Sequence, residues 1–358
     1  MSGGDQNARL ARALGVTKPP PLAPLGSWPT PVEPLDVLGE ELGLELFVKR
    51  DDLGGALYGG NKVRKLEFLL GAARQRGCRS VITIGGVGSN QIIGTAVYAR
   101  ELGMETHAVV FPQPVTAAVA ASIRRAAALG VRLTALPDPN ALPEVLERMH
   151  APEPTELIPA GGSSPAGNLA FVAAAFELAE QVRAGSLPEP EEIFVALGSG
   201  GTLAGLALGM HLAGLRTCLV GVRAAPEDAV NEAVVRRQIT ALGGLLRRAG
   251  AAVKPPPDLP FGIVHDQYGA AYGMPTPGSE RALRTARERA GLALDATYTA
   301  KAFAAILEGA ATTQRVLFWN TANGRDLVAL PTSDDAQPVP EEIESWLVRD
   351  RVEAPGVS

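Results

Sequence analysis

Cysteine is nearly absent from the chain: only Cys78 and Cys218 occur among 358 residues, and they lie far apart in the sequence. This excludes a disulfide framework and a cysteine-based zinc site, and it is typical of a protein in a reducing cytoplasm. The four histidines are scattered and form no close pair, so we expect no bound metal.

Long apolar runs and an excess of charge of one sign are also missing. No stretch of about 18 apolar residues occurs, and residues 1–16 lack the apolar segment of a signal peptide. The net charge of −5 gives no electrostatic reason for nucleic acid or an anionic membrane to be a partner. We therefore expect a cytoplasmic protein in which any anionic ligand binds at a local site.

What the chain does contain is typical of a globular protein with two domains, since 46% of its residues are hydrophobic and 20% are charged. Residues 17–34 are rich in proline and predict an extended arm. The expected strands are 44–50, 80–86, 106–111, 192–198, 218–223 and 315–320. The expected helices are 63–76, 90–102, 117–129, 166–184, 202–214, 226–249, 278–290 and 299–313. This alternation predicts an α/β fold of mostly parallel sheets with helices on both faces.

Three glycine-rich turns stand out: IGGVGSNQ (84–91), PAGGSSPAGN (159–168) and ALGSGGTLAG (196–205). In the third turn, backbone N–H groups and the N-terminus of the next helix form an anion cradle, although a tight turn without a ligand has the same features. Ser89 and Asn90 are expected to cap the helix after the first turn, where exposed N–H groups and the Ser89 hydroxyl also suit a carboxylate. Three such turns at one edge of a sheet predict a ligand with a phosphate and a carboxylate.

The stretch LYGGNKVRKLEFLL (57–70) places Lys62 behind two glycines and an asparagine. A lysine taken alone is usually a solvated surface residue. A Schiff-base lysine must lose its proton near neutral pH, which burial or a neighbouring cation promotes. Arg64 and Lys65 supply such cations, and the apolar residues that follow supply cover. Lys65 comes one helical turn later, so it shares a face with Lys62 and is able to reach a ligand phosphate.

These segments resemble a known family. VKRDDLGG and YGGNKVRKLEFLL, within residues 48–70, are similar to the lysine segment of the fold-type II pyridoxal-phosphate enzymes. More narrowly, they resemble the group that joins D-cysteine desulfhydrase with 1-aminocyclopropane-1-carboxylate (ACC) deaminase. The resemblance continues in order through IGGVGSNQ, PAGGSSPAGNLAFVAAAFELAEQ, ALGSGGTLAGL, YGAAYGMPTP, LDATYTAKA and VLFWNTANG.

The resemblance implies a site, residue by residue. Lys62 matches the lysine that binds pyridoxal 5'-phosphate covalently, and Lys65 matches a second lysine near the phosphate. The other matching positions are Gly198, Ser199, Gly200, Gly201 and Thr202 around the phosphate; Ser89, Asn90, Gln91, Gly162 and Ser163 around the substrate; Tyr272 and Tyr298 as active-site tyrosines; and Thr299 and Thr321 at the cofactor. Lys62, Ser89 and the two tyrosines are the expected catalytic residues. Without the family, each tyrosine would count as a half-buried core residue with a hydrogen-bonded hydroxyl.

The resemblance also implies a fold and an assembly. The fold is the two-domain, tryptophan synthase β-like type with open, twisted, mostly parallel sheets. Residues 1–64 and 166–358 are expected to form a large cofactor domain, and residues 65–165 a small domain. The active site is expected in the cleft between the two domains, and the expected assembly is a homodimer.

The implied reaction is an α,β-elimination. Lys62 gives up the cofactor to the substrate amine and then moves the proton at Cα, while the pyridine ring takes up the charge. Loss of a group at Cβ leads to pyruvate and ammonia, with hydrogen sulfide as the other product from cysteine. A tyrosine, with an ordinary pKa of ~10, is suited to protonate the leaving atom.

Two positions favour desulfhydrase-like chemistry on a small β-substituted amino acid such as D-cysteine. Thr299 stands where the deaminase branch has a glutamate at the ring nitrogen, and a hydroxyl leaves the ring neutral more often. Thr321 stands where that branch has a leucine. The alternatives are ACC deaminase, a β-replacing synthase, and a pyridoxal-phosphate-binding protein without catalysis.

The sequence also departs from the family pattern. Gln91 is followed by Ile92, Ile93 and Gly94, where polar or cationic residues are usual. Residues 320–323 read Asn-Thr-Ala-Asn instead of the usual His-Thr-Gly-Gly. The identity of the substrate and its handedness therefore stay open at this point.

Overall fold

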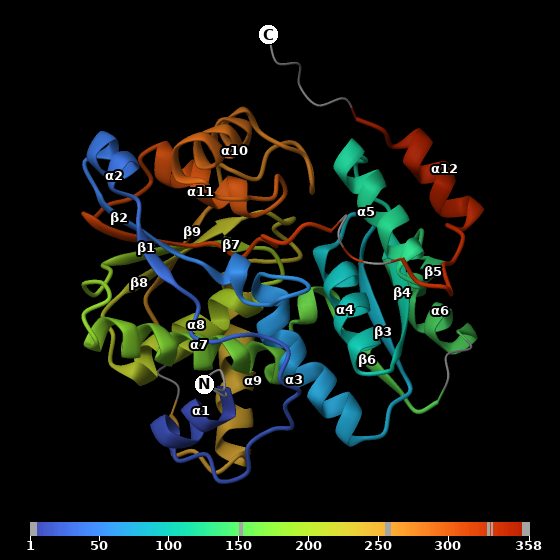
Figure 1. The fold of residues 1–358 in the computed structure, drawn as a ribbon, viewed down its shortest axis with the longest axis horizontal. Coiled ribbons are helices and arrows are strands. Elements are labelled where there is room, and N and C mark those ends of the chain that lie inside the picture. The colour runs from blue at the N-terminus through green and yellow to red at the C-terminus, as the bar shows by residue number, and fades with distance from the viewer. Residues whose placement is uncertain (1–5, 150–152, 255–258, 328–329, 331, 353–358) are drawn as a thin grey trace. The chain divides into compact units, whose positions relative to one another are not determined.

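The computed structural model of the protein describes residues 6–149, 153–254, 259–327, 330 and 332–352 (Figure 1). The chain forms two compact units. The large unit comprises residues 1–68 and 163–325, and the small unit comprises residues 69–162 and 326–358. The boundary after residue 68 falls inside helix α3 (Asn61–Gln75).

The large unit contains a six-stranded sheet in the order β1-β2-β10-β7-β8-β9. Its strands are β1 (Val32–Pro34), β2 (Glu45–Lys49), β7 (Glu192–Leu197), β8 (Cys218–Arg223), β9 (Phe261–Val264) and β10 (Arg315–Trp319). β1 pairs antiparallel with β2, and the other neighbours are parallel. Leu197 at the end of β7 lies opposite Arg223 at the end of β8. The carboxyl ends of the central strands therefore share one edge, where ligands bind in such sheets.

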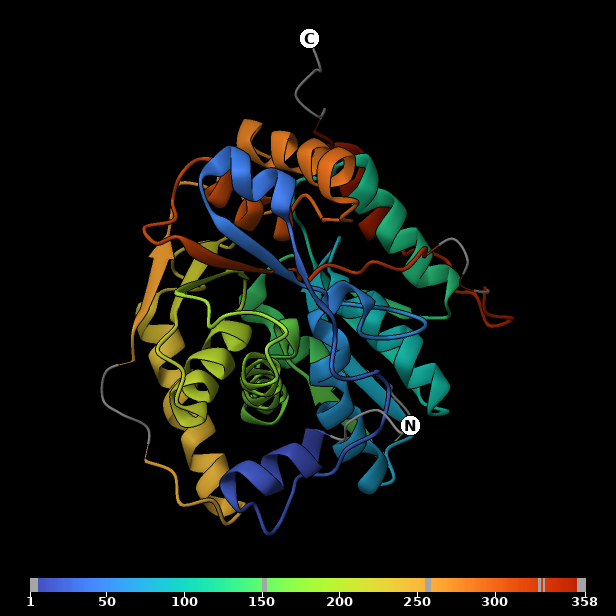
Figure 2. The same cartoon turned by 60° about the vertical axis from the view of Figure 1, so that its left-hand side comes forward.

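Helices cover both faces of this sheet (Figures 1 and 2). Along β7, Ile193 and Val195 enter one hydrophobic core and Phe194 enters the other, as the two-residue period of a strand requires. The first core includes residues of α1 (Gln6–Leu14), α7 (Pro165–Arg183), α8 (Gly201–Ala213) and α9 (Glu232–Arg248). The second includes residues of α2 (Asp36–Leu42), α10 (Pro277–Ala290) and α11 (Thr299–Leu307). Because both faces are buried, the interiors of the central strands β7, β8 and β10 are apolar.

The small unit contains a four-stranded parallel sheet in the order β5-β4-β3-β6. Its strands are β3 (Ser80–Gly86), β4 (Glu105–Phe111), β5 (Arg132–Ala135) and β6 (Thr155–Ile158). Its helices are α4 (Asn90–Glu101), α5 (Ala117–Ala128), α6 (Leu142–Arg148) and α12 (Glu341–Arg349), together with the second half of α3. In the described part of the chain, no helix has the length and hydropathy to cross a bilayer.

Every expected strand and helix is present, although two helices are shorter than predicted. The helix expected at 226–249 begins at Glu232, because the Asn231 side chain caps it by accepting the Val234 N–H at 3.1 Å. The helix expected at 299–313 ends at Leu307, and Gly309 two residues later has a left-handed φ of +81°.

The C-terminal segment corrects the expected domain division, which assigned it to the large domain. Residues 326–358 belong to the small unit. Val115 N–H donates to the Asp350 carbonyl at 2.8 Å, and Ser333 N–H donates to the Ala128 carbonyl at 2.9 Å. These backbone bonds join segments far apart in the sequence, so no local pattern could have predicted them.

Candidate active site

The turn between β7 and α8 has the geometry of an anion cradle. Gly198 to Gly200 lead directly into α8, whose first residue is Gly201. A Cβ at position 201 would collide with the side chains of Asn168 and Ser163 and would lie 2.8 Å from Lys65 Nζ. Only glycine therefore lets these polar groups approach the helix N-terminus, where free N–H groups and the helix dipole favour an anion.

Lys65 and two serines complete this cradle. Lys65 Nζ donates to Ser163 Oγ at 3.0 Å, and Ser163 Oγ lies 2.7 Å from Ser199 Oγ. The lysine is only 1% exposed, and burial together with the charge of Lys62 lowers its pKa well below the ordinary value. A phosphate in this place would supply the negative charge that a buried ammonium group needs. The residues present therefore fit a phosphorylated ligand.

Three further side chains line or support the cradle, and the sequence reasoning missed them. Asn61 Nδ2 donates to Thr202 Oγ1 at 3.3 Å. Gln238 on α9 donates to the Ser199 carbonyl at 2.8 Å and accepts from Asn168 Nδ2 at 3.1 Å. The Asn168 Oδ1 atom is buried without a hydrogen bond among the described residues. Asn168 ends the second glycine-rich turn and could have been noticed there, whereas Gln238 lies inside a helix with no local signal.

Lys62 is the second residue of α3 and is partly buried. Burial lowers its pKa to about 8, and the charge of Asp295 offsets part of that effect. Its lead-in needs glycine: Gly60 has a φ of +83°, and a Cβ there would lie 2.5 Å from the Thr321 carbonyl oxygen. Asn61 N–H donates to that same carbonyl at 3.2 Å. Thr321 is thus beside the lysine segment, with its backbone oxygen as the observed contact.

The two predicted tyrosines meet each other. The hydroxyl groups of Tyr272 and Tyr298 form a short hydrogen bond, and their rings cross at 63° with centroids 6.2 Å apart. The Tyr298 ring lies against the phosphate turn, because a Cβ at Gly198 would be 2.9 Å from its Cε1. Burial raises the pKa of both phenols, so both keep their protons at neutral pH.

Thr299 opens α11 and is fully buried. Its hydroxyl donates to Asp295 Oδ2 at 2.8 Å and accepts from the Asp295 N–H at 2.8 Å. The other carboxylate oxygen, Asp295 Oδ1, accepts the Tyr298 N–H at 2.8 Å. Asp295 was not among the predicted site residues, and it lies before the N-cap, Tyr298, where no common capping pattern marks it.

Four predicted substrate residues lie in the small unit. Ser89 caps α4 by accepting the Gln91 N–H at 3.3 Å, as expected for a helix start. Gln91 is buried and donates to Thr95 of the same helix at 2.9 Å. Asn90 begins α4, and Gly162 immediately precedes the large unit. The roles of these residues at the substrate stay predictions.

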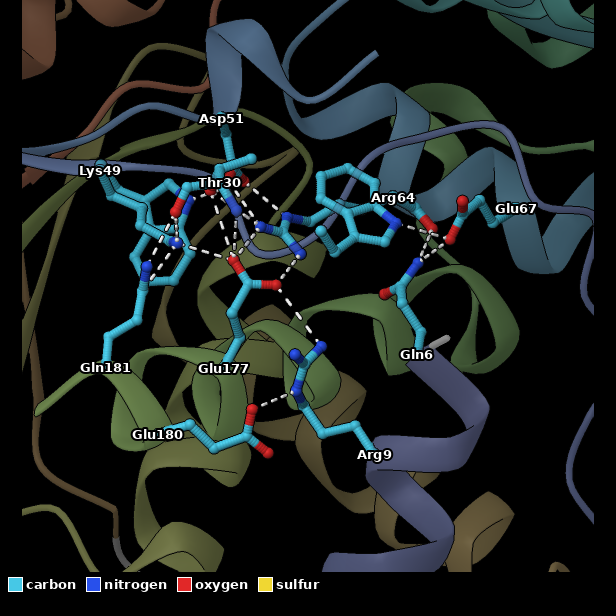
Figure 3. A network of polar contacts seen from close by, with 12 residues as sticks. Gln6, Arg9, Thr30, Lys49, Asp51, Arg64, Glu67, Glu177, Glu180 and Gln181 are labelled. Carbon is cyan, nitrogen blue, oxygen red and sulfur yellow. Dashed lines mark hydrogen bonds and ion pairs between the residues drawn. The ribbon is translucent and has the colours of Figure 1, made fainter. Parts of the chain in front are cut away.

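The start of α3 is fixed by a buried ionic network, which Figure 3 shows. Arg64 donates to Asp51 Oδ1 at 2.7 Å and to Glu177 Oε1 at 2.8 Å. Lys49 donates to the same Glu177 oxygen at 2.6 Å. Burial by itself would raise the pKa of Glu177, but the charges of Arg64 and Lys49 outweigh it and hold that pKa far below the ordinary value.

The N-terminal arm is part of this network. Thr30 donates to Asp51 Oδ1 at 2.8 Å, and Arg64 stacks on the Trp28 ring at 3.9 Å from its centroid. The Asp51 carbonyl in turn accepts the Gly60 N–H at 2.8 Å, two residues before Lys62. The proline-rich arm is therefore partly built into the core and supports the lysine segment.

The fold and the cradle together define an α/β protein with a site for a phosphorylated ligand and a lysine, Lys62, whose pKa burial lowers. In the described residues, no group of three or more His, Cys, Asp or Glu side chains is arranged to hold a metal ion. The family model for "Pyridoxal-phosphate dependent enzyme" matches residues 24–321. The chain belongs to this family, its cofactor is pyridoxal phosphate, and the predicted fold-type II class is confirmed.

Several characterised or named proteins are similar to this chain. Nocardicin C-9' epimerase of Nocardia uniformis subsp. tsuyamanensis is 36% identical over 90% of this chain and 97% of the relative. A putative ACC deaminase of Pyrococcus abyssi is 33% identical, over 78% and 84% of the two chains. D-cysteine desulfhydrase of Salmonella newport is 32% identical, over 82% and 89%. The crystal structure of an ACC deaminase homologue has a TM-score of 0.71 at 29% identity, over 89% and 94%.

Proposed function

We propose that this protein is a lyase that catalyses α,β-elimination of a small β-substituted amino acid such as D-cysteine. The products are pyruvate, ammonia and the leaving group, which is sulfide for cysteine. The observation that carries the proposal is the Tyr272–Tyr298 pair beside the phosphate turn. Because burial raises the pKa of both phenols, they stay protonated and are suited to give a proton to a leaving thiolate.

Lys62 has two tasks in this proposal. It binds the cofactor covalently, and its released amine is the base that removes the Cα proton. A pKa near 8 suits that second task, because part of the amine is then neutral close to neutral pH. Pyridoxal phosphate, when bound, supplies the electron sink for the carbanion. Lys65, Ser163 and the start of α8 hold its phosphate.

The remaining assignments follow from the family resemblance. We propose that the substrate carboxylate binds at Ser89, Asn90 and Gln91, with Gly162 close by. Both cysteines are free, which suits a reducing cytoplasm. A homodimer is the assembly that the resemblance favours.

Epimerisation at Cα is a second candidate, and the 36% identical Nocardia epimerase supports it. Both reactions begin with loss of the Cα proton, and they differ in whether a group then leaves from Cβ or a proton returns. ACC deamination is a third candidate, supported by the Pyrococcus relative and the solved homologue. By the family resemblance alone, Thr299 in place of the deaminase branch's glutamate and Thr321 in place of its leucine favour the lyase.

A substrate panel separates these reactions. The purified holoenzyme is incubated in D2O with D- and L-cysteine, β-chloroalanine of either hand, and ACC. Pyruvate and sulfide indicate elimination, 2-oxobutyrate indicates ACC deamination, and deuterium at Cα with inverted configuration indicates epimerisation. We expect pyruvate and sulfide from D-cysteine, and none of these products from Lys62→Ala. Epimerisation without any keto acid would overturn the proposal.

Tyr298→Phe is the matched test of the acid role. Removing this hydroxyl should slow elimination from cysteine, whose thiolate needs a proton, much more than from β-chloroalanine, whose chloride needs none. Equal slowing of both substrates would mean that Tyr298 does not protonate the leaving group.

A further inference from the structure

The hydroxyl of Thr299 is held in one direction by its neighbour. Its oxygen lies 2.8 Å from Asp295 Oδ2 and 2.8 Å from the Asp295 main-chain nitrogen. The nitrogen carries a hydrogen, so it must donate to the threonine oxygen. The carboxylate carries none when ionised, so the threonine must donate to it. Both contacts have good hydrogen-bond lengths.

This count leaves Thr299 without a proton for any other partner. A hydroxyl has one hydrogen and two acceptor sites. The hydrogen is given to Asp295 Oδ2, and one acceptor site is filled by the Asp295 N–H. What Thr299 has left is one acceptor site. A ring nitrogen that meets this hydroxyl must therefore bring its own hydrogen.

We propose that Asp295, acting through Thr299, keeps the ring nitrogen of the bound cofactor protonated. The inference rests on the proposed contact between Thr299 and that nitrogen. The ring N–H donates to Thr299 Oγ1, and Thr299 Oγ1–H donates to Asp295. The carboxylate thereby compensates the positive charge of the ring across one hydroxyl. Asp295 is a positioning residue in this arrangement, because it reaches the cofactor only through Thr299.

Other groups besides Thr299 interact with the Asp295 carboxylate. Asp295 Oδ1 and Oδ2 accept the N–H groups of Tyr298 and Thr299 at the start of α11, at 2.8 and 3.3 Å. The negative charge of Asp295 raises the pKa of both Lys62 and Lys301. Burial acts in the other direction and lowers the pKa of each. Helix N-termini and nearby ammonium groups both stabilise a carboxylate anion.

The contact with Asp295 reverses the effect that Thr299 by itself would have on the protonation of the ring nitrogen. Taken alone, a hydroxyl at the ring nitrogen favours a neutral ring and a weaker electron sink. Backed by Asp295, the same hydroxyl becomes an acceptor and favours a protonated ring. The charge of the ring then suits elimination, epimerisation and cyclopropane opening alike, so the choice among these reactions must depend on other residues.

Asp295→Asn tests this arrangement with almost no change of shape. The asparagine Oδ1 can still accept the Tyr298 N–H, which leaves its amide group facing Thr299. The amide and the main-chain N–H of residue 295 then both donate to Thr299 Oγ1 and fill its acceptor sites. The threonine hydrogen is released and becomes a donor, so the ring nitrogen should lose its proton.

The experiment is 15N NMR of the full-length holoenzyme loaded with pyridoxal phosphate labelled at the ring nitrogen, without substrate. We expect the 15N chemical shift of a protonated pyridinium nitrogen in the wild type. In Asp295→Asn we expect the chemical shift of an unprotonated pyridine nitrogen. Thr299→Ser, which keeps the hydroxyl, should behave like the wild type. An unprotonated nitrogen in the wild type, or a protonated one in Asp295→Asn, would overturn the inference.

Thr276→Ala is the matched control for a purely structural role of Asp295. Thr276 caps α10 in the same unit by accepting the Ser279 N–H at 3.0 Å. Loss of this hydroxyl cap should lower the midpoint temperature of unfolding and leave the 15N signal of the cofactor ring nitrogen unchanged. The NMR result does not depend on which reaction is catalysed. A protonated ring in a protein that performs no elimination would contradict the proposed function and leave this inference standing.

Discussion

Two buried cations on the same helix turn have opposite environments. Arg64 is fully buried and is met by the carboxylates of Asp51 and Glu177. Its neighbour Lys65 is equally buried, but its Nζ donates to the hydroxyl of Ser163. Burial disfavours the charged form of both side chains and so lowers the pKa of each. For Arg64 the two carboxylates outweigh it and the pKa rises, whereas for Lys65 burial prevails and the pKa falls.

The two side chains therefore differ in the direction of their pKa: it rises for Arg64 in the ionic network and falls for Lys65 at the cradle. The protein compensates Arg64 internally, so that side chain holds α3 to the arm and to α7. Lys65 holds its amine at the cradle, where it donates to Ser163, and we expect an incoming phosphate to bind there. A buried lysine whose pKa falls, next to a helix N-terminus, is therefore a better signal for an anion site than lysine content.

Glu177→Gln should give the largest effect on stability. It removes the shared partner of Arg64 and Lys49 and leaves two buried cations with reduced compensation. Breaking a buried pair in this way costs about 3–5 kcal/mol. The free energy of unfolding of the apo protein, measured by urea denaturation, should fall by this order.

Glu144→Gln is the control, because Glu144 and Arg148 form an exposed pair at 2.8 Å with both side chains 66% exposed. Exposed pairs contribute at most about 1 kcal/mol. If Glu177→Gln and Glu144→Gln lower the free energy of unfolding by similar amounts, the buried network is no more stabilising than an exposed ion pair, and the prediction is wrong.

The next effect is a pH dependence of the apo protein that depends on Lys62. Its folded pKa of about 8 lies below the ordinary value of 10.5, so between these values the unfolded chain binds a proton that the folded chain does not. Stability contributed by this residue should therefore rise with pH across that window, by at most about 3 kcal/mol.

Lys62→Met isolates this contribution, because the difference in unfolding free energy between the apo wild type and the variant should change from pH 8 to pH 10. The proposed covalent bond to the cofactor removes the free amine of Lys62 in the holoenzyme, so this pH dependence should disappear when the protein is loaded with cofactor. A constant difference between the apo proteins would mean that Lys62 is solvated as an ordinary lysine.

Lys65→Met should have the smallest effect on stability and a selective effect on binding. It replaces a buried amine, whose pKa burial lowers, with an apolar side chain of similar length, so the unfolding free energy should stay equal or rise. A charge-assisted bond to phosphate is worth about 1.5–3 kcal/mol, which predicts a Kd for pyridoxal phosphate at least about tenfold higher.

Pyridoxal, which lacks the phosphate, provides the control for this variant. Its affinity, measured by the same absorbance titration of apo protein, should be unchanged in Lys65→Met. If both ligands weaken equally, Lys65 does not contact the phosphate.

Much of the site was predictable because its parts are local. The alternation of strands and helices, the lead-in to Lys62 and the turn from Gly198 to Thr202 depend on residues close together in the chain. Ser89 as a helix cap is of the same kind. Each of these features has a short-range physical cause, such as a strand's two-residue period or a helix start that needs a cap.

By itself, therefore, the sequence determined the fold class, and it predicted Lys62 as the cofactor lysine and residues 198–202 as the phosphate turn. Only the tertiary structure decided which charges are compensated, since Lys49 and Glu177 lie 128 residues apart along the chain. It also decided that the Thr299 proton belongs to Asp295 and that residues 326–358 join the small unit. The physical reason is that charge compensation and the direction of a hydrogen bond depend on distances in space, which a linear pattern does not contain.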